Sequence, residues 1–207
     1  MSQFLRNTYL AVPVLILSVA FIALDIFYLR LKKFNYMVRH LVNRTRNLEI
    51  RKFMVLTHQA NDVIPSSVQI IAVAMLLGFI WKDWKSGVFL ISALMLQLGV
   101  VSFTKQIAIR ARPPHLTAHK IMTSGSYPSG HSASTMGMAF LISAFILPYL
   151  PIWAVATIFI VLIGNAIVTA YGRLYLDMHW ATDIVGGWVL SVITTIVTLY
   201  IWSLPSN

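Results

Sequence analysis

The chain has 207 residues, of which 58% are hydrophobic and 11% are charged. A soluble domain carries about 25% charged residues, so this composition argues against a soluble fold and indicates a lipid environment. The absence of cysteine excludes disulfides and thiolate metal sites. The net charge of +10 favours an anionic partner, and lipid headgroups or phosphates fit that role better than nucleic acid, for which no base-reading motif is present.

Several stretches are apolar enough to span a bilayer, which takes about 20 residues of helix. They are 9–29, 64–81, 87–104, 132–150, 152–171 and 184–204. Tryptophans lie near the ends of these stretches, where an aromatic belt would place them. We therefore predict an all-α fold, a polytopic membrane helix bundle with about six transmembrane helices, forming a single domain over residues 1–207.

Between the first two spans, residues 30–62 are polar and basic. Apolar residues recur there at roughly the spacing of one helix face, with arginines and lysines between them; they are Phe34, Met37, Leu41, Leu48 and Phe53. This pattern predicts an interfacial amphipathic helix on the membrane surface. Such a helix either gathers anionic lipids or is a solvated connector, and the sequence favours neither.

Two further polar stretches, 105–131 and 173–183, follow later in the chain. Because two predicted spans separate them, both must open on the same side of the membrane. The basic stretch 30–62 belongs to that side too, whereas Lys82 and Lys85 belong to the other. Polar residues that are far apart in the sequence can therefore meet at one membrane face.

The first of these polar stretches begins "KQIAIRARPP", residues 105–114. Lys105 and Arg112 are seven residues apart, which is two helical turns, so we expect them to share a helix face, with Arg110 off that face. The two prolines after Arg112 are then expected to end the helix. Two cations on one face suit an anion such as phosphate, although basic residues at a helix end also snorkel toward water.

The same stretch closes with "YPSGH", residues 127–131. Pro128, Ser129 and Gly130 favour a tight turn that leads into the next span. Unpaired N–H groups at such a helix start form an anion site, Gly130 lets the anion approach the backbone, and Ser129 adds a hydroxyl donor. His131 can donate or accept a proton near neutral pH. The alternative interpretation is that Ser129 only caps the helix.

The last polar stretch reads "GRLYLDMHWATD", residues 172–183. Arg173 ends one span, and His179 and Asp183 are four residues apart, hence adjacent on one helical face. A carboxylate beside an imidazole fixes its tautomer and stabilises its cation, as a histidine base or nucleophile requires. Asp177 could compete as the partner of His179 but faces elsewhere on a helix. The alternative interpretation of the pattern is an ion pair on the helix surface.

The three stretches together place three cations, backbone donors, two histidines and a carboxylate at one membrane face. Three cations with backbone donors match the charge of a phosphoryl group. With two histidines, one can attack phosphorus while the other protonates the leaving group. The candidate catalytic residues are His179, His131 and Asp183, and the candidate phosphate-binding residues are Lys105, Arg112, Ser129, Gly130 and Arg173.

These motifs resemble the signature of the type 2 phosphatidic acid phosphatase family of membrane lipid phosphatases. That signature is K-x6-R-P, then P-S-G-H, then S-R-x5-H-x3-D. The chain has the same spacing in all three parts, starting at Lys105, Pro128 and Arg173. It departs from the pattern at Gly172, where the family usually has a serine, so a possible hydroxyl donor to the phosphate is missing. The resemblance covers most of the C-terminal half, and the N-terminal half matches only in hydropathy.

The resemblance implies hydrolysis of a lipid phosphomonoester or pyrophosphate through a phosphohistidine. His179 would attack phosphorus, Asp183 would orient it, and His131 would protonate the leaving group before water releases phosphate. The cations would hold the phosphate oxygens, so we expect neither a metal nor another cofactor, and the chain has no dense carboxylate cluster for magnesium. His115 and His119 lie in the same loop but are left out of the site, because loop histidines are usually solvated.

Two other functions stay open on the sequence. A phosphotransferase would pass phosphate from a lipid pyrophosphate to another lipid, and no residue distinguishes such an acceptor from water. A transporter is less favoured, because the polar residues lie at helix ends and inverted repeats are not evident. The expected partners are a lipid phosphate substrate and membrane lipids, without nucleic acid, and the sequence carries no signal for one particular lipid or for an oligomeric state.

The charge distribution bears on the orientation in the membrane. The positive-inside rule would place the basic stretch, and with it the site, in the cytoplasm. Members of the family that the chain resembles usually face outward, and an interfacial helix need not follow a rule that describes flexible loops. We therefore expect a multi-pass protein of the cell (inner) membrane whose active site lies on the extracytoplasmic face.

Overall fold

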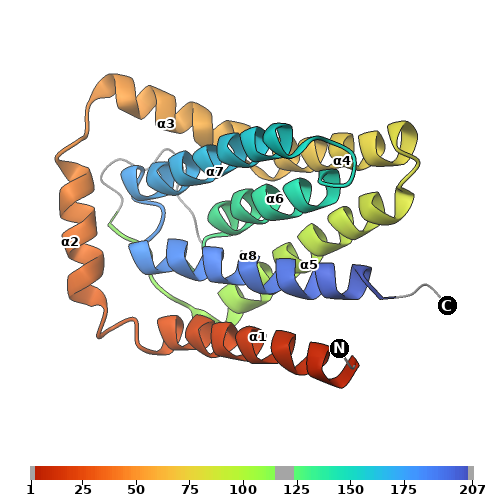
Figure 1. The fold of residues 1–207 in the computed structure, drawn as a ribbon. Helices are drawn as coiled ribbons and strands as arrows, with labels where there is room; N and C mark the ends of the chain where they lie inside the picture. Colours follow the sequence, from red (N-terminus) through yellow and green to blue (C-terminus); the bar gives the residue numbers. More distant parts are fainter. Residues whose placement is uncertain (1–2, 115–123, 205–207) are drawn as a thin grey trace.

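Helices make up the regular structure of the residues that the computed structural model describes, 3–114 and 124–204, with side chains described from Tyr9 onward (Figure 1). Within these residues no strand occurs. The helices are α1 (Gln3–Ile26), α2 (Lys32–Asn43), α3 (Leu48–Ala60), α4 (Val63–Ile80), α5 (Trp84–Ala108), α6 (Gly130–Ile146), α7 (Ile152–Tyr175) and α8 (Ala181–Trp202). The all-α prediction is confirmed.

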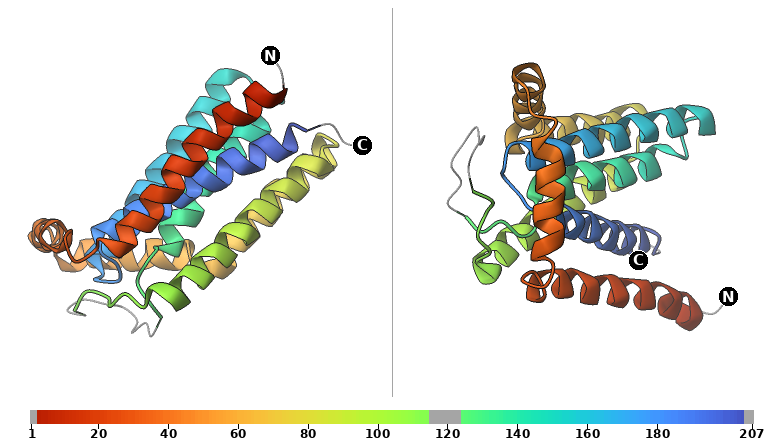
Figure 2. Two further views of the ribbon diagram at one scale, coloured as in Figure 1. Left: turned by 90° about the horizontal axis from the view of Figure 1, so that it is seen from below. Right: turned by 90° about the vertical axis from the view of Figure 1, so that its left-hand side faces the viewer.

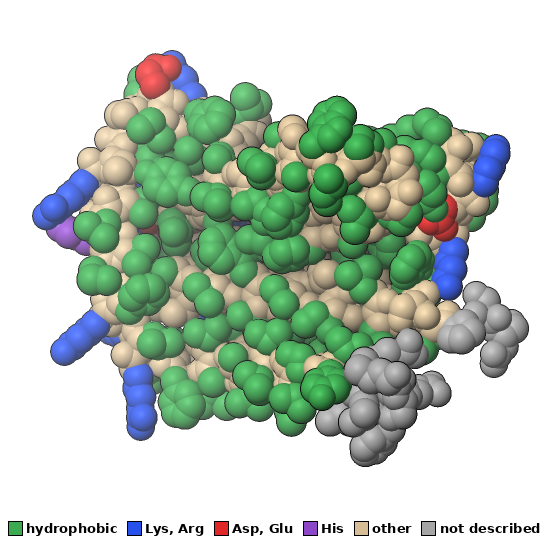
Figure 3. Space-filling model, viewed as in Figure 1, with side chains coloured by type: hydrophobic (Ala, Val, Ile, Leu, Met, Phe, Trp, Pro, Cys, Tyr) green, Lys and Arg blue, Asp and Glu red, His purple; other side chains and the backbone are tan. Residues whose placement is uncertain are grey.

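Five of the described helices are long and apolar enough to cross a membrane, namely α1, α4, α5, α7 and α8. The sixth apolar helix, α6, is shorter, with 17 residues. On the face shown in Figure 3, hydrophobic side chains cover the middle of the bundle, while lysines and arginines gather at its two ends. The chain is a multi-pass integral membrane protein, and the predicted membrane helix bundle is confirmed.

The short helix α6 lies at the centre of the bundle. Twelve of its 17 residues are buried, and it packs most extensively on α7 and α8. Small residues allow this close packing, since a Cβ on Gly137 would lie 2.8 Å from Oε1 of Gln97 on α5. Gln97 in turn donates a hydrogen bond to the hydroxyl of Ser191 on α8, at 3.1 Å. Protein neighbours therefore surround α6, and its N-terminus is held in a fixed position.

The basic stretch folds as two helices, α2 and α3, so the prediction of one amphipathic helix is corrected. The chain breaks between them because Asn47 caps α3, with its side chain accepting from the N–H of Ile50 at 2.8 Å. Helix α2 crosses the end of the bundle at a steep angle to the other helices, whereas α3 packs against α7 (Figures 1 and 2). The polar end of the bundle is thus covered on one side by protein.

The polar connections 109–114, 124–129 and 176–180 gather at the end of the bundle where α2 lies (Figure 1). The turn between α4 and α5, which contains Lys82, lies at the other end. The expectation that both polar stretches and the basic stretch open on one side is therefore met.

Candidate active site

Arg112 lies in an extended segment after α5 and not on the helix. Helix α5 ends at Ala108, because Ile109 adopts a left-handed backbone with a φ of 42°. The predicted helix through both cations, and its termination by the prolines, are therefore wrong. Lys105 remains on the last turn of α5.

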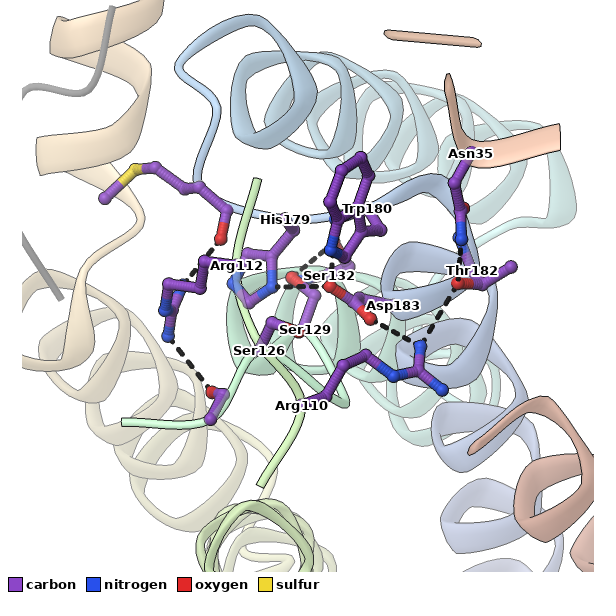
Figure 4. Close-up of polar contacts among 12 residues, drawn as sticks. Asn35, Arg110, Arg112, Ser126, Ser129, Ser132, His179, Trp180, Thr182 and Asp183 are labelled. Atoms are coloured by element: carbon purple, nitrogen blue, oxygen red, sulfur yellow. Dashed lines mark hydrogen bonds and ion pairs between the residues drawn. The ribbon is translucent and has the colours of Figure 1, made fainter. Parts of the chain in front are cut away.

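The Arg112 guanidinium joins two loops of the site (Figure 4). It donates to the carbonyl of Met178 at 2.6 Å, and to the carbonyls of Ser124 and Gly125 at 3.0 and 3.2 Å. Met178 directly precedes His179 in the chain. Arg112 thus holds the segment after α5 beside the loop that carries His179.

Ser129 caps the start of α6. Its side chain accepts from the N–H of Ser132, and the two hydroxyls are 2.9 Å apart, so the Ser129 hydroxyl is engaged in the cap. The first backbone bond of the helix runs from the N–H of Ala133 to the carbonyl of Ser129, at 3.0 Å. The N–H groups of Gly130 and His131 precede that bond and are the donors that a helix start offers to an anion.

Two glycines of α8 let this turn pack against the helix. A Cβ on Gly187 would lie 2.6 Å from the carbonyl oxygen of Ser129, and a Cβ on Gly186 would collide with the ring of Tyr127. The N–H of Ser129 donates to the carbonyl of Asp183 at 3.0 Å. The turn and the helix that carries Asp183 are therefore joined backbone to backbone.

His179 lies beside Asp183, as their spacing predicts. Its Nδ1 is 3.4 Å from Oδ2 of Asp183, and both side chains are buried. They do not share a helix, because α8 begins at Ala181; Asp183 reaches back over the helix start, where Oδ2 also accepts from the N–H of Trp180 at 2.8 Å. Since Nδ1 faces the carboxylate, Nε2 is the ring nitrogen left to react.

The surroundings of His179 favour the neutral imidazole. Burial lowers its pKa well below the ordinary histidine value, and nearby cations lower it further; they are Arg173, Arg112 and Lys105. A neutral imidazole with an unprotonated nitrogen is the form that can act as a nucleophile. The cations that would attract a phosphate therefore also keep His179 in that form.

A cavity of about 210 Å³ lies beside these residues. Four of the predicted site residues line it, namely Lys105, Gly130, His131 and Arg173. Asn61 and Asp62 add polar walls at the start of α4, and the walls farther along α4 and α5 are apolar, formed by Ile70, Leu94, Leu98 and Val101. A cavity with a cationic end and an apolar wall suits an anion that is attached to an apolar chain.

A family model described as "PAP2 superfamily" matches residues 86–205, which is more than half of the chain and contains all three motifs. The chain belongs to the PAP2 superfamily. It is similar to the undecaprenyl-diphosphatase of Sulfolobus acidocaldarius, with 28% identity over 127 residues that cover 58% of this chain. The matched region spans 57% of the length of that relative.

Two solved structures have a similar arrangement of helices. The PAP2-type phosphatidylglycerolphosphate phosphatase from Bacillus subtilis has a TM-score of 0.82, covering 91% of this chain and 94% of that chain at 19% identity. LpxE from Aquifex aeolicus has a TM-score of 0.65, covering 81% of this chain and 95% of that chain at 21% identity. The fold is therefore a transmembrane PAP2 bundle.

His58 on α3 lies at the site although it is outside the PAP2 motifs. It is buried, and its Nδ1 is 2.7 Å from a terminal nitrogen of Arg173 and 3.2 Å from Nε2 of His131. It comes 115 residues before Arg173, from the stretch assigned to the surface helix. No spacing rule in the sequence could have connected the two.

Arg110, at one of the unspecified positions of the first motif, is the second site residue that the PAP2 motifs do not name. It donates to Oδ1 of Asp183 at 2.8 Å and to Asp25 of α1 at 2.9 Å, and its guanidinium lies over the rings of Tyr28 and Tyr127. On the helix expected from the sequence, Arg110 would lie off the face that Lys105 and Arg112 share. The structure shows that Asp183 lies between Arg110 and His179 (Figure 4).

Asp177 faces α2 and the connection between α2 and α3. It forms ion pairs with Arg39 of α2 at 2.9 Å and with Arg46 at 2.8 Å. Burial alone would raise the pKa of Asp177, but hydrogen bonds and charge from these two arginines outweigh it, so the pKa is lowered. Arg39 also donates to the carbonyl of Pro114 at 3.0 Å. Helix α2 is thus tied to the loop that carries His179.

Gly172, the one departure from the PAP2 pattern, packs against α3. A Cβ at this position would lie 3.3 Å from Sδ of Met54, so a serine would require Met54 to yield by a few tenths of an ångström. His115 and His119 lie outside the described residues. Among those described, no group of three or more histidines and carboxylates is placed to hold a metal ion.

Proposed function

We propose that this PAP2 protein is a lipid phosphatase that hydrolyses a phosphomonoester or pyrophosphate of a membrane lipid through a phosphohistidine, without a metal. The observation that carries the proposal is that all three motifs contribute to one cavity, which has a cationic end and an apolar wall. The names of its relatives support the substrate class, since one is an undecaprenyl-diphosphatase and another a phosphatidylglycerolphosphate phosphatase.

In the first step, Nε2 of His179 attacks phosphorus and the P–O bond to the leaving lipid or lipid phosphate breaks. His131, which lines the cavity, gives its proton to the departing oxygen. Asp183, 3.4 Å from Nδ1 of His179, stabilises the positive charge that develops on the imidazole. The product of this step is a phosphohistidine and a neutral alcohol or a lipid phosphate.

In the second step, water attacks the phosphohistidine and gives a proton to His131, so that inorganic phosphate leaves and His179 is restored. The phosphoryl oxygens are neutralised throughout by Lys105, Arg112 and Arg173, together with the N–H groups of Gly130 and His131 at the start of α6. These donors take the part that metal ions play in other phosphoryl-transfer enzymes.

The cavity is proposed to face the extracytoplasmic side of the cell membrane. Arginines at this end are held by carboxylates, since Arg39 and Arg46 pair with Asp177 and Arg110 pairs with Asp183. The positive-inside rule counts basic residues in short loops, and here the basic stretch is folded into two helices. Its charge is therefore a weak guide to orientation.

Phosphate release from a panel of lipids tests the function. The panel contains phosphatidic acid, phosphatidylglycerol phosphate, a polyprenyl pyrophosphate and a lipid A phosphate, each offered to the detergent-purified protein. We expect the wild type to release phosphate from at least one of them and His179→Ala to be slower by at least about a thousandfold. His40→Ala, which changes an exposed histidine of α2, is the control and should keep the wild-type rate.

Equal rates for the wild type and His179→Ala would refute the mechanism. The ratio of free phosphate to dephosphorylated lipid also shows whether water or another lipid accepts the phosphoryl group. A hydrolase yields one phosphate for each dephosphorylated lipid, whereas a phosphotransferase yields a second phosphorylated lipid in place of free phosphate.

A further inference from the structure

A third histidine adjoins the proposed general acid. His58 is 6% exposed, and its ring centroid is 4.9 Å from that of His131. Its Nδ1 lies 3.2 Å from Nε2 of His131, which is a hydrogen-bond distance. What this contact does depends on which of the two nitrogens carries the proton.

Arg173 fixes the donor and acceptor roles. One of its terminal nitrogens is 2.7 Å from the same Nδ1 of His58, and an arginine N–H can only donate. Nδ1 of His58 is therefore an acceptor. The contact between the two histidines is then a hydrogen bond only if Nε2 of His131 carries a proton and donates it to His58.

Nε2 of His131 is also the nitrogen on the cavity side. It lies 3.7 Å from Oδ1 of Asp62, and both His131 and Asp62 line the cavity. A general acid must carry its proton on the nitrogen that faces the leaving group. We propose that His58 is a positioning residue that holds the transferable proton of His131 on Nε2; this inference rests on the proposed function.

Substrate binding strengthens this arrangement. Nδ1 of His58 has one lone pair, and Arg173 and His131 both compete for it. A bound phosphate offers Arg173 a charged acceptor, which makes a stronger hydrogen bond than a neutral nitrogen does. The lone pair of His58 is then left to His131, so Nε2 of His131 stays protonated while the substrate is bound, until the departing oxygen takes the proton.

Two amide substitutions of His58 separate this role from packing. Asparagine places its Oδ1, an acceptor, near the position of Nδ1, whereas glutamine moves the amide one bond farther out. Each variant is assayed with a lipid phosphomonoester, whose leaving alkoxide needs a proton, and with p-nitrophenyl phosphate, whose leaving group does not. The quantity compared is kcat/KM, because it includes only steps up to the release of the leaving group.

We expect His58→Asn to stay within about threefold of the wild type on both substrates. His58→Gln should lower kcat/KM by about 10- to 100-fold on the lipid phosphomonoester and by less than about threefold on p-nitrophenyl phosphate. His131→Asn should show the same selectivity. Adding His58→Gln to His131→Asn should lower kcat/KM no further, because His58 acts through His131.

Equal losses on both substrates would overturn the inference, because they would mean that His58 acts through Arg173 or through packing. A further loss in the double variant, or equal rates for His58→Asn and His58→Gln, would also overturn it while leaving the lipid phosphatase in place. A wild-type protein that is inactive on every lipid of the panel, phosphomonoester or pyrophosphate, and on p-nitrophenyl phosphate would overturn the proposed function itself, and the inference with it.

Discussion

The two carboxylate oxygens of Asp183 contact different partners, a histidine and an arginine. Oδ2 faces Nδ1 of His179, and Oδ1 accepts from Arg110. Because Arg110 neutralises part of the carboxylate charge, less of that charge remains to make His179 more basic. The direction of the pKa of His179 agrees, since burial and cations lower it. Asp183 thus orients the imidazole without drawing a proton onto it in the resting state.

Replacing Arg110 should therefore affect both stability and activity. Arg110→Leu leaves Asp25 and Asp183 without their buried cation, so we expect the free energy of unfolding to fall by about 3–5 kcal/mol and kcat/KM to fall with it. Arg110→Lys keeps the charge but not the planar fork and should lose less. Denaturant unfolding in detergent measures the change, and Arg44→Leu, at an exposed arginine, is the control. Equal losses in Arg110→Leu and Arg44→Leu would contradict this role.

The pKa of His179 predicts activity under acidic conditions. A histidine whose pKa is lowered stays neutral as the pH falls through the ordinary value of about 6.5, so its acid limb in kcat/KM should lie below that pH. Arg112→Gln removes one of the cations that lower this pKa, so the limb should move to higher pH. The pH dependence of kcat/KM is measured on a phosphomonoester and on a pyrophosphate. A limb that is the same on both substrates belongs to the enzyme and not to ionisation of the substrate. A limb at or above pH 6.5 on both would show that the prediction is wrong.

At the scale of elements, the contact between the turn before α6 and the start of α8 positions the groups of the site. It needs a helix without side chains at Gly186 and Gly187 and a backbone bond from Ser129 to Asp183. This contact fixes the position of the N–H donors at the start of α6 relative to the carboxylate of Asp183. The same contact places the first turn of the central helix α6 at the cavity.

A methyl group at Gly187 tests this contact. In Gly187→Ala the Cβ would lie 2.6 Å from a backbone oxygen that cannot move without the turn, so we expect a loss of about 1–3 kcal/mol in stability and a lower kcat/KM. Gly164→Ala, on α7, is the matched control, because nothing lies within 4 Å of its Cβ. That variant should be neutral or more stable by up to about 1 kcal/mol. Similar behaviour of the two variants would argue against the contact.

Hydropathy locates the spans well because it is a local property. The span expected at 152–171, for example, is α7, Ile152–Tyr175. The end of α5 is different, since Ile109 has no sequence feature that predicts a left-handed backbone, whereas the prolines after Arg112 do predict a helix end. Tertiary packing decides such positions, and a single sequence does not show it.

The residues of the site also fall into two groups, those that the sequence identifies and those that only the structure shows. Motif spacing identifies residues that lie on the turn, at the helix ends and beside one another, such as His179 and Asp183. Arg110 and His58 reach the site through contacts with residues 73 and 115 positions away. Only the packing of α8 beside the segment after α5, and of α3 against α7, brings these side chains to their partners, so no pattern along the chain reveals their roles.

At the scale of the whole molecule, the two ends of the bundle lie on opposite sides of the membrane, which makes the orientation measurable. The chain has no cysteine, so Lys33→Cys on α2 and Lys85→Cys at the start of α5 each carry a single thiol. We expect an impermeant maleimide to label Lys33→Cys in intact cells, and to label Lys85→Cys only after the membrane is opened. The reverse pattern would place the cavity in the cytoplasm and contradict the proposed orientation.

Helix α2 is mechanically coupled to the loop that carries His179. Asn35 exchanges two hydrogen bonds with Thr182, both at 3.1 Å, and Arg39 binds Asp177, so this helix holds the loop of His179 from two points. The outer side of α2 carries the exposed residues Lys32 and Lys33. A force on α2 is therefore transmitted through these contacts to the loop that carries His179.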